Sequence, residues 1–110
     1  MADVASRDMR LSVPDGILVN AAAALCLTPV PDPKRQAMAL DVIREHLRQG
    51  NDDHPAMAPV LAALRILLVS PKPDLSGFAT WRLRAALAEL MMWRLGEGLE
   101  VQRIENRRTA

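Results

Sequence analysis

Two proline clusters constrain this chain more than any other feature of its sequence. Residues 28–33 read TPVPDP, and residues 70–73 read SPKP. Because proline lacks a backbone N–H and has a fixed φ angle, these clusters exclude a continuous helix and favour stiff, extended connectors. The segments around them are rich in Ala, Leu and Met, which favour helix, and have little alternation of β-branched residues. We therefore predict an all-α fold, a small four-helix bundle with proline-rich connections.

Capping residues place the ends of the four predicted helices. Ser12 and Asp15 resemble a capping box with Asp in the place of Glu. Asp32 followed by Pro33 is a strong helix start, and Gly50 is suited to a helix C-terminus. The remaining predicted N-caps are Asp53 and Asp74. The predicted helices span residues 13–27, 33–49, 55–69 and 74–108.

The last predicted helix is the longest and carries all three aromatic residues of the chain. A surface helix normally has one apolar stripe, but here the apolar residues form two, so we expect apolar contacts on two sides. One side can face the domain core, and the other needs a second copy or another protein. Gly96 and Gly98 each disfavour helix by about 1 kcal/mol relative to alanine. The sequence leaves open whether the helix ends, kinks or frays at these glycines or continues past them. The first stripe is Phe78, Trp81, Ala85, Ala88, Met92, Leu95 and Leu99, and the second is Leu83, Leu87, Leu90, Met91, Arg94, Val101 and Ile104.

Two further helices have more apolar surface than a bundle core requires. Residues 13–27 are apolar almost all round, and Arg65 is the only charge in residues 55–69. A helix contributes about three of every seven positions to a bundle core. We therefore predict that residues 13–27 form the central helix of the bundle or one half of a helix-pair interface. We also predict that the excess apolar surface is covered by a partner. Residues 33–49 have the single apolar stripe of an ordinary outer helix.

The length and the net charge of the chain limit the number of domains and the kinds of partner that we expect. A chain of 110 residues is expected to form one domain. We predict a flexible N-terminal tail (1–11), a single helical domain (12–106) and a basic C-terminal tail (107–110). The net charge of +1 argues against nucleic acid or an anionic membrane as a partner.

Cellular location follows from two absences in the sequence. The longest stretch without a charge, residues 16–30, is shorter than the roughly 20 residues that cross a bilayer. No apolar segment of signal-peptide type precedes it. The single cysteine, Cys26, excludes an intrachain disulfide and is expected to be a small core residue. We predict a cytoplasmic protein.

The sequence lacks the patterns of common catalytic and cofactor sites. It has no Gly-rich phosphate loop after a strand, no cysteine pair and no GxSxG motif. Asp52, Asp53 and His54 suggest a metal site, but three adjacent loop residues lack the spread of ligands that metals use, and Asp53 is better explained as an N-cap. His46 is expected to be solvated or hydrogen-bonded. We predict no metal, no cofactor and no enzymatic activity.

We therefore expect a non-catalytic protein-interaction module. It would be a small helical homodimer that binds or sequesters another protein through apolar helical surfaces, as adaptors, chaperones and antiactivators do. Glu89, the one acid within the apolar part of the last helix, would face solvent or pair with Arg82 or Arg84 of a second copy. The predicted partner-binding residues are Phe78, Trp81, Leu83, Leu87, Leu90, Met91, Met92, Trp93 and Leu95.

The alternative is a helix-turn-helix DNA-binding transcriptional regulator. Residues 33–49 and 55–69, joined by a short polar loop, are the candidate helix pair. The second helix, however, offers only Arg65 and no Asn, Gln, Ser or Lys to contact base edges. Three arginines near the C-terminus could contact phosphate, but neighbouring glutamates offset their charge. These residues are Arg103, Arg107 and Arg108, with Glu97, Glu100 and Glu105.

Overall fold

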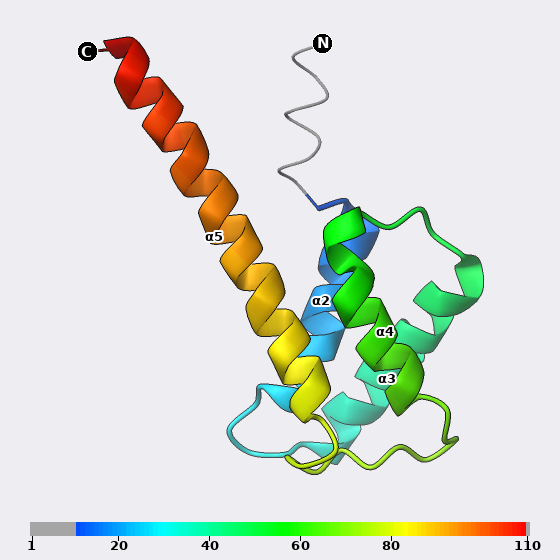
Figure 1. Cartoon of the computed structure of the whole chain (residues 1–110). Helices are drawn as coiled ribbons and strands as arrows, with labels where there is room; N and C mark the ends of the chain where they lie inside the picture. Colours follow the sequence, from blue (N-terminus) through cyan, green and yellow to red (C-terminus); the bar gives the residue numbers. More distant parts are fainter. Residues whose placement is uncertain (1–10, 110) are drawn as a thin grey trace.

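The computed structural model of the chain describes residues 11–109, with side chains described as far as Gly96. The regular structure of these residues is entirely helical and packs as a small bundle (Figure 1). The predicted all-α class is therefore confirmed for the described part of the chain. No helix in this part is both long enough and apolar enough to cross a membrane. The elements are α2 (Val13–Cys26), α3 (Pro33–Gln49), the 3₁₀ helix η1 (Pro55–Met57), α4 (Ala58–Leu67) and α5 (Trp81–Thr109).

Some predictions fall on residues that are not described. The predicted N-terminal tail lies outside the described residues except for Leu11. The side chains of the predicted basic tail, residues 107–110, also lie outside them. The same holds for the far ends of the two apolar stripes, Leu99, Val101 and Ile104.

The first two predicted helices agree with the structure to within one residue. The Ser12 hydroxyl accepts the Asp15 N–H at 3.2 Å and so caps α2. The Asp32 carboxylate accepts two N–H groups of the first turn of α3, at 3.1 and 3.3 Å. Gly50 ends α3 in the left-handed conformation, with φ 65°, which side chains other than glycine rarely adopt. Local capping chemistry therefore sets both helices.

The predicted third helix begins at the predicted residue, Pro55, but with a 3₁₀ turn, and its predicted C-terminal end is wrong. The segment opens with η1, and α4 ends at Leu67 rather than Val69. The predicted N-cap, Asp53, does not cap it. His54 does so instead, because its Nδ1 accepts the Ala56 N–H at 3.0 Å. The carboxylate of Asp53 is directed to another partner, described below.

The predicted start of the fourth helix is also wrong, because α5 begins at Trp81 and not at Asp74. The Asp74 carboxylate accepts the Ser76 N–H at 2.9 Å, and the Ser76 hydroxyl accepts the Ala79 N–H at 3.3 Å. Such side chain-to-backbone bonds compete with helix formation. The Thr80 hydroxyl donates to the Ser76 carbonyl at 2.9 Å and completes a separate turn. Asp74 therefore caps a turn in the connector and not the helix.

The core is built from buried side chains of α2, α3, η1, α4 and α5. α2 packs against α3 and α5, and α4 packs against α5 (Figure 1). Both proline-rich connectors lie at one end of the bundle, and the loop between α3 and η1 lies at the other. Burial of the Leu, Ile, Val and Met side chains between these helices is the main source of stability. The largest buried apolar side chains are Leu18, Ile43, Met57, Val60, Leu64 and Leu83.

Candidate functional site

The two apolar stripes of α5 lie in different environments. The side chains of Leu83, Leu87 and Leu90 are buried in the core, together with Ala86. Three of the nine predicted partner-binding residues therefore hold the domain together and are not available to a partner in this fold. Sequence periodicity could not decide this, because either stripe could have faced the bundle.

The opposite side of α5 is exposed. Trp81, Ala85, Ala88, Met92 and Leu95 recur every three or four residues and fall within about 80° of the helix circumference. All five are exposed, with Trp81 at 52 % and Met92 at 67 %. We call these five residues the exposed face of α5. They are members of the first predicted stripe, so the structure places apolar side chains on both sides of this helix.

The remaining predicted residues, Phe78, Met91 and Trp93, lie outside this face. Phe78, in the turn before α5, is 87 % exposed, and Met91 is also exposed. Trp93 is half-buried, and its ring centroid lies 4.9 Å from that of His54 with the planes tilted by 48°. The Arg82 guanidinium lies 5.5 Å from the centroid of the Trp81 ring, a cation–π arrangement on the surface. Trp93 therefore belongs to the domain's packing more than to the exposed face.

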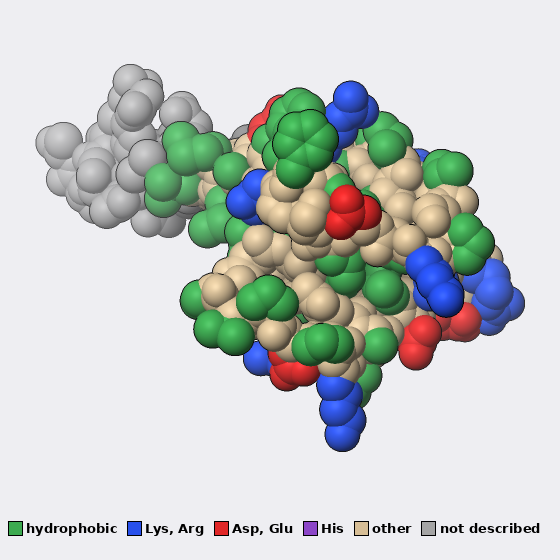
Figure 2. Space-filling view, turned by 90° about the horizontal axis from the view of Figure 1, so that it is seen from below, with side chains coloured by type: hydrophobic (Ala, Val, Ile, Leu, Met, Phe, Trp, Pro, Cys, Tyr) green, Lys and Arg blue, Asp and Glu red, His purple; other side chains and the backbone are tan. Residues whose placement is uncertain are grey.

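Two hollows lie between α4 and α5, next to the exposed face. Their volumes are about 390 and 240 Å³. Pro59 and Glu89 line both hollows, and the smaller one is also lined by the exposed side chain of Ile66. Figure 2 views the end of the molecule that carries the proline-rich connectors, and it shows hydrophobic side chains at the surface in separate groups with charged side chains between them. The apolar surface thus extends from the exposed face of α5 onto α4.

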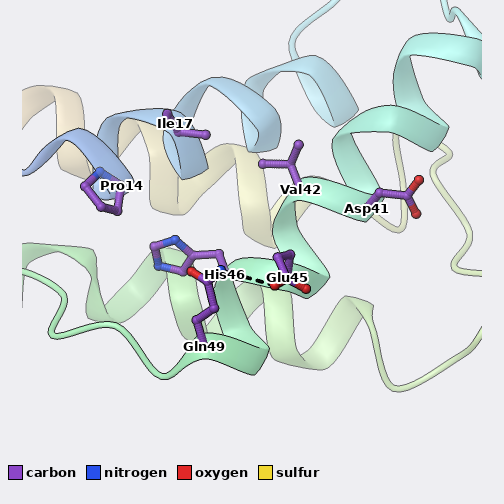
Figure 3. Close-up of a pocket in the computed structure, with 7 residues that line it drawn as sticks. All are labelled: Pro14, Ile17, Asp41, Val42, Glu45, His46 and Gln49. Carbon is purple, nitrogen blue, oxygen red and sulfur yellow. Dashed lines mark hydrogen bonds between the residues drawn. The ribbon is translucent and has the colours of Figure 1, made fainter.

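A third hollow lies between α2 and α3, where no site was expected from the sequence. Its volume is about 450 Å³, and we call it the α2–α3 groove (Figure 3). Ile17 of α2 and Val42 of α3 extend into it, and both remain partly exposed. Asp41 and Glu45 provide acidic groups at its rim, and His46 also lines it.

A buried polar cluster joins the start of α2 to the end of α3 and to the loop that follows α3. Asp15 of α2, His46 of α3 and Asp53 of the following loop place their ligand atoms within 4.8 Å of one another. His46 Nε2 lies 2.7 Å from Asp53 Oδ1, and the Asp15 carboxylate accepts the His54 N–H at 3.0 Å. His46 is therefore hydrogen-bonded, as predicted. The role of Asp15 was missed, since its position in a capping box explained it locally.

The two carboxyl groups of the cluster are shifted in opposite directions. Burial raises the pKa of Asp53, and the adjacent Asp15 raises it further, although His46 opposes this. Burial also acts to raise the pKa of Asp15. Hydrogen bonds from Asp53, from the His54 N–H and from Ser12 outweigh that effect, so the pKa of Asp15 is lowered. The two carboxyl groups therefore titrate as a coupled pair, and Asp53 is the more readily protonated of the two.

Cys26 has the character expected of a structural thiol. It packs against the core, and its Sγ donates to the Ala22 carbonyl at 3.4 Å. Burial raises the pKa of the thiol to about 11, so the reactive thiolate is scarce at neutral pH.

Comparison of the chain with protein-family models, curated proteins and solved structures gives no match. The function must therefore be argued from the geometry of this chain.

Proposed function

We propose that this protein is a non-catalytic interaction module that works as a homodimer, with the exposed face of α5 as the dimer interface. The supporting observation is that an entire apolar side of α5 is exposed while the opposite side fills the core. With flanking Phe78 and Met91 it leaves on the order of 600 Å² of apolar side chain exposed, at the upper end of the largest patches found on monomers. Two such patches correspond to about 1,200 Å², the lower end of stable interfaces.

The charges beside the exposed face favour pairing of two copies in antiparallel orientation. Arg82 and Glu89 lie two helical turns apart on the same margin of this face. In an antiparallel helix pair, matching margins of the two copies face each other. Arg82 of each copy can then lie beside Glu89 of the other. Ala85 and Ala88, between them, have small side chains that allow the two helix backbones to approach closely.

Capture of a different protein would use apolar surface that remains outside the dimer interface. The α2–α3 groove, with a volume of about 450 Å³, is such a hollow. Ile17 and Val42 would take an apolar side chain, and the acidic group of Asp41 favours a segment that also carries Lys or Arg. Glu45 is already paired with Arg48. An adaptor, chaperone or antiactivator that binds a basic amphipathic segment is the functional type that fits this arrangement.

The packing of the helices gives no support to a helix-turn-helix regulator. α3 packs on α2 and α4 packs on α5, so the two candidate helices are not each other's main partners. The exposed charged side chain of α4 is Arg65. We therefore do not favour DNA binding.

Light scattering coupled to size-exclusion chromatography tests the proposal directly. The chain has a mass of 12.1 kDa, and we expect twice this value at high protein concentration, with dissociation on dilution. A monodisperse monomer at every concentration would refute the dimer. Addition of salt should weaken the dimer only modestly, because the interface is largely apolar and the charge pairs lie at its edge.

A further inference from the structure

We propose that Asp15, His46 and Asp53 form a binding site for one divalent transition-metal ion, with Zn²⁺ as the best match. The three side chains come from α2, from α3 and from the loop after α3, and so a metal would join three segments of the bundle. This inference is independent of the proposed dimer, since none of the three residues lies on α5.

The geometry provides the first argument. All three ligand atoms lie within 4.8 Å of one another. Tetrahedral zinc places its ligand atoms about 3.3 Å apart, so the widest pair must close by about 1.5 Å, which a side-chain rotation can supply. The loop that carries Asp53 is held against α3, because the Asn51 side chain donates to the His46 carbonyl at 3.2 Å. The ligands are thus brought together by the fold before any ion binds.

The second argument is a buried oxygen without a partner. Asp15 is 1 % exposed, and its Oδ2 accepts the His54 N–H. Its Oδ1 is the one buried side-chain oxygen or nitrogen in the described residues that has no hydrogen-bond partner. A buried carboxylate oxygen without a donor is costly. A cation held between the three side chains would satisfy it, as would a proton carried by Asp53.

A metal ion at this site would need both carboxylates ionised and the imidazole neutral, because only the deprotonated groups coordinate. Asp15, Asp53 and His46 would then be its three protein ligands.

The ligand set selects the metal. Ca²⁺ and Mg²⁺ prefer oxygen ligands only, and Ca²⁺ takes six to eight of them. Imidazole together with carboxylates suits Zn²⁺, whose sites often combine three protein ligands with a fourth position for water. His46 lines the α2–α3 groove, which gives an ion and its water a route from solvent (Figure 3).

The decisive variant is Asp53→Asn. The asparagine amide can donate to Asp15 Oδ1 in place of the acid proton, so the metal-free fold should be retained, but the amide is a poor ligand for zinc. Asp52→Asn is the matched control, because Asp52 is an exposed acid in the same loop and the charge change is identical. His46→Gln is a second variant that removes the imidazole.

The test is isothermal titration of ZnCl₂ into the full chain, without an affinity tag and after treatment with a chelator. We expect one Zn²⁺ per chain for the unaltered protein and for Asp52→Asn, and at least tenfold weaker binding for Asp53→Asn and His46→Gln. Excess Zn²⁺ at about a hundred times its Kd should raise the thermal midpoint of the unaltered chain by roughly 10 °C, but not that of Asp53→Asn. Absence of binding, or equal binding by Asp52→Asn and Asp53→Asn, would overturn the proposal.

Discussion

Replacement of Met92 by alanine should weaken the proposed dimer without loosening the monomer. Met92 is 67 % exposed on the centre of the exposed face of α5. Full burial of a Met side chain contributes about 1.5–3 kcal/mol, so loss of the exposed part of Met92 removes about 1 kcal/mol per copy. A symmetric dimer contains the change twice, which gives about 2 kcal/mol and a Kd about 30-fold higher.

Met38→Ala is the matched control. Met38 is 63 % exposed, but it lies on α3, away from the proposed interface. Both changes replace an exposed methionine in a helix with the best helix former, so both should leave the stability of the monomer within about 0.5 kcal/mol. The two variants therefore differ only in whether the lost side chain lies at the interface.

Sedimentation equilibrium at several loading concentrations measures the dimer Kd of the unaltered chain and of both variants. Thermal melts followed by circular dichroism verify that the monomers remain folded. We expect the Kd to rise for Met92→Ala alone. If Met38→Ala weakens the dimer as much as Met92→Ala, or if neither changes a dimer that does form, the interface has been placed on the wrong helix.

Three further predictions concern charge and pH. Arg82→Glu should weaken the dimer, and the double change with Glu89→Arg should restore it in sedimentation experiments; lack of restoration would exclude the antiparallel arrangement. Without metal, the stability that protonated Asp53 contributes should be fully present below the ordinary Asp pKa of 3.8, and it should be lost as pH rises through the raised pKa of Asp53 in the folded protein. Asp15 has the opposite effect: its lowered pKa contributes stability that is lost as pH falls. Urea titrations should show that the free energy of unfolding decreases with rising pH in the unaltered chain and not in Asp53→Asn. The same pH dependence in both proteins would argue against the proton on Asp53. Burial raises the pKa of Cys26 from 9.0 to about 11, so its thiolate should be about a hundredfold scarcer near pH 8 in the folded chain than in the unfolded chain. A thiol reagent that reacts equally fast with the folded and the urea-unfolded protein would contradict this.

The local features of the fold followed directly from the sequence. Ser12, Asp32 and Gly50 set the limits of α2 and α3 through hydrogen bonds and backbone conformations that involve only neighbouring residues. The all-α class followed in the same way from helix-forming, apolar composition. The predicted N-caps Asp53 and Asp74 were wrong, because the carboxylate of each residue interacts with a different group. A capping rule does not predict which of several available partners an acidic side chain contacts.

The functional surfaces depended on tertiary structure. The periodicity of α5 predicted two apolar stripes, yet only packing against α2 and α4 decided that Leu83, Leu87 and Leu90 would be buried. The cluster of Asp15, His46 and Asp53 was not visible in the sequence, because its members come from three separate segments. Each of them also had an adequate local explanation, as part of a capping box, as a hydrogen-bonded residue at the edge of an apolar stripe, or as an N-cap.

Local bonding rules therefore determined which parts of this chain are helical and where two of the helices begin and end. The docking of those helices decided which apolar stripe of α5 is exposed and which polar side chains are buried together. The physical reason is that capping and periodicity act over a few residues, whereas burial depends on contacts between residues distant in the sequence.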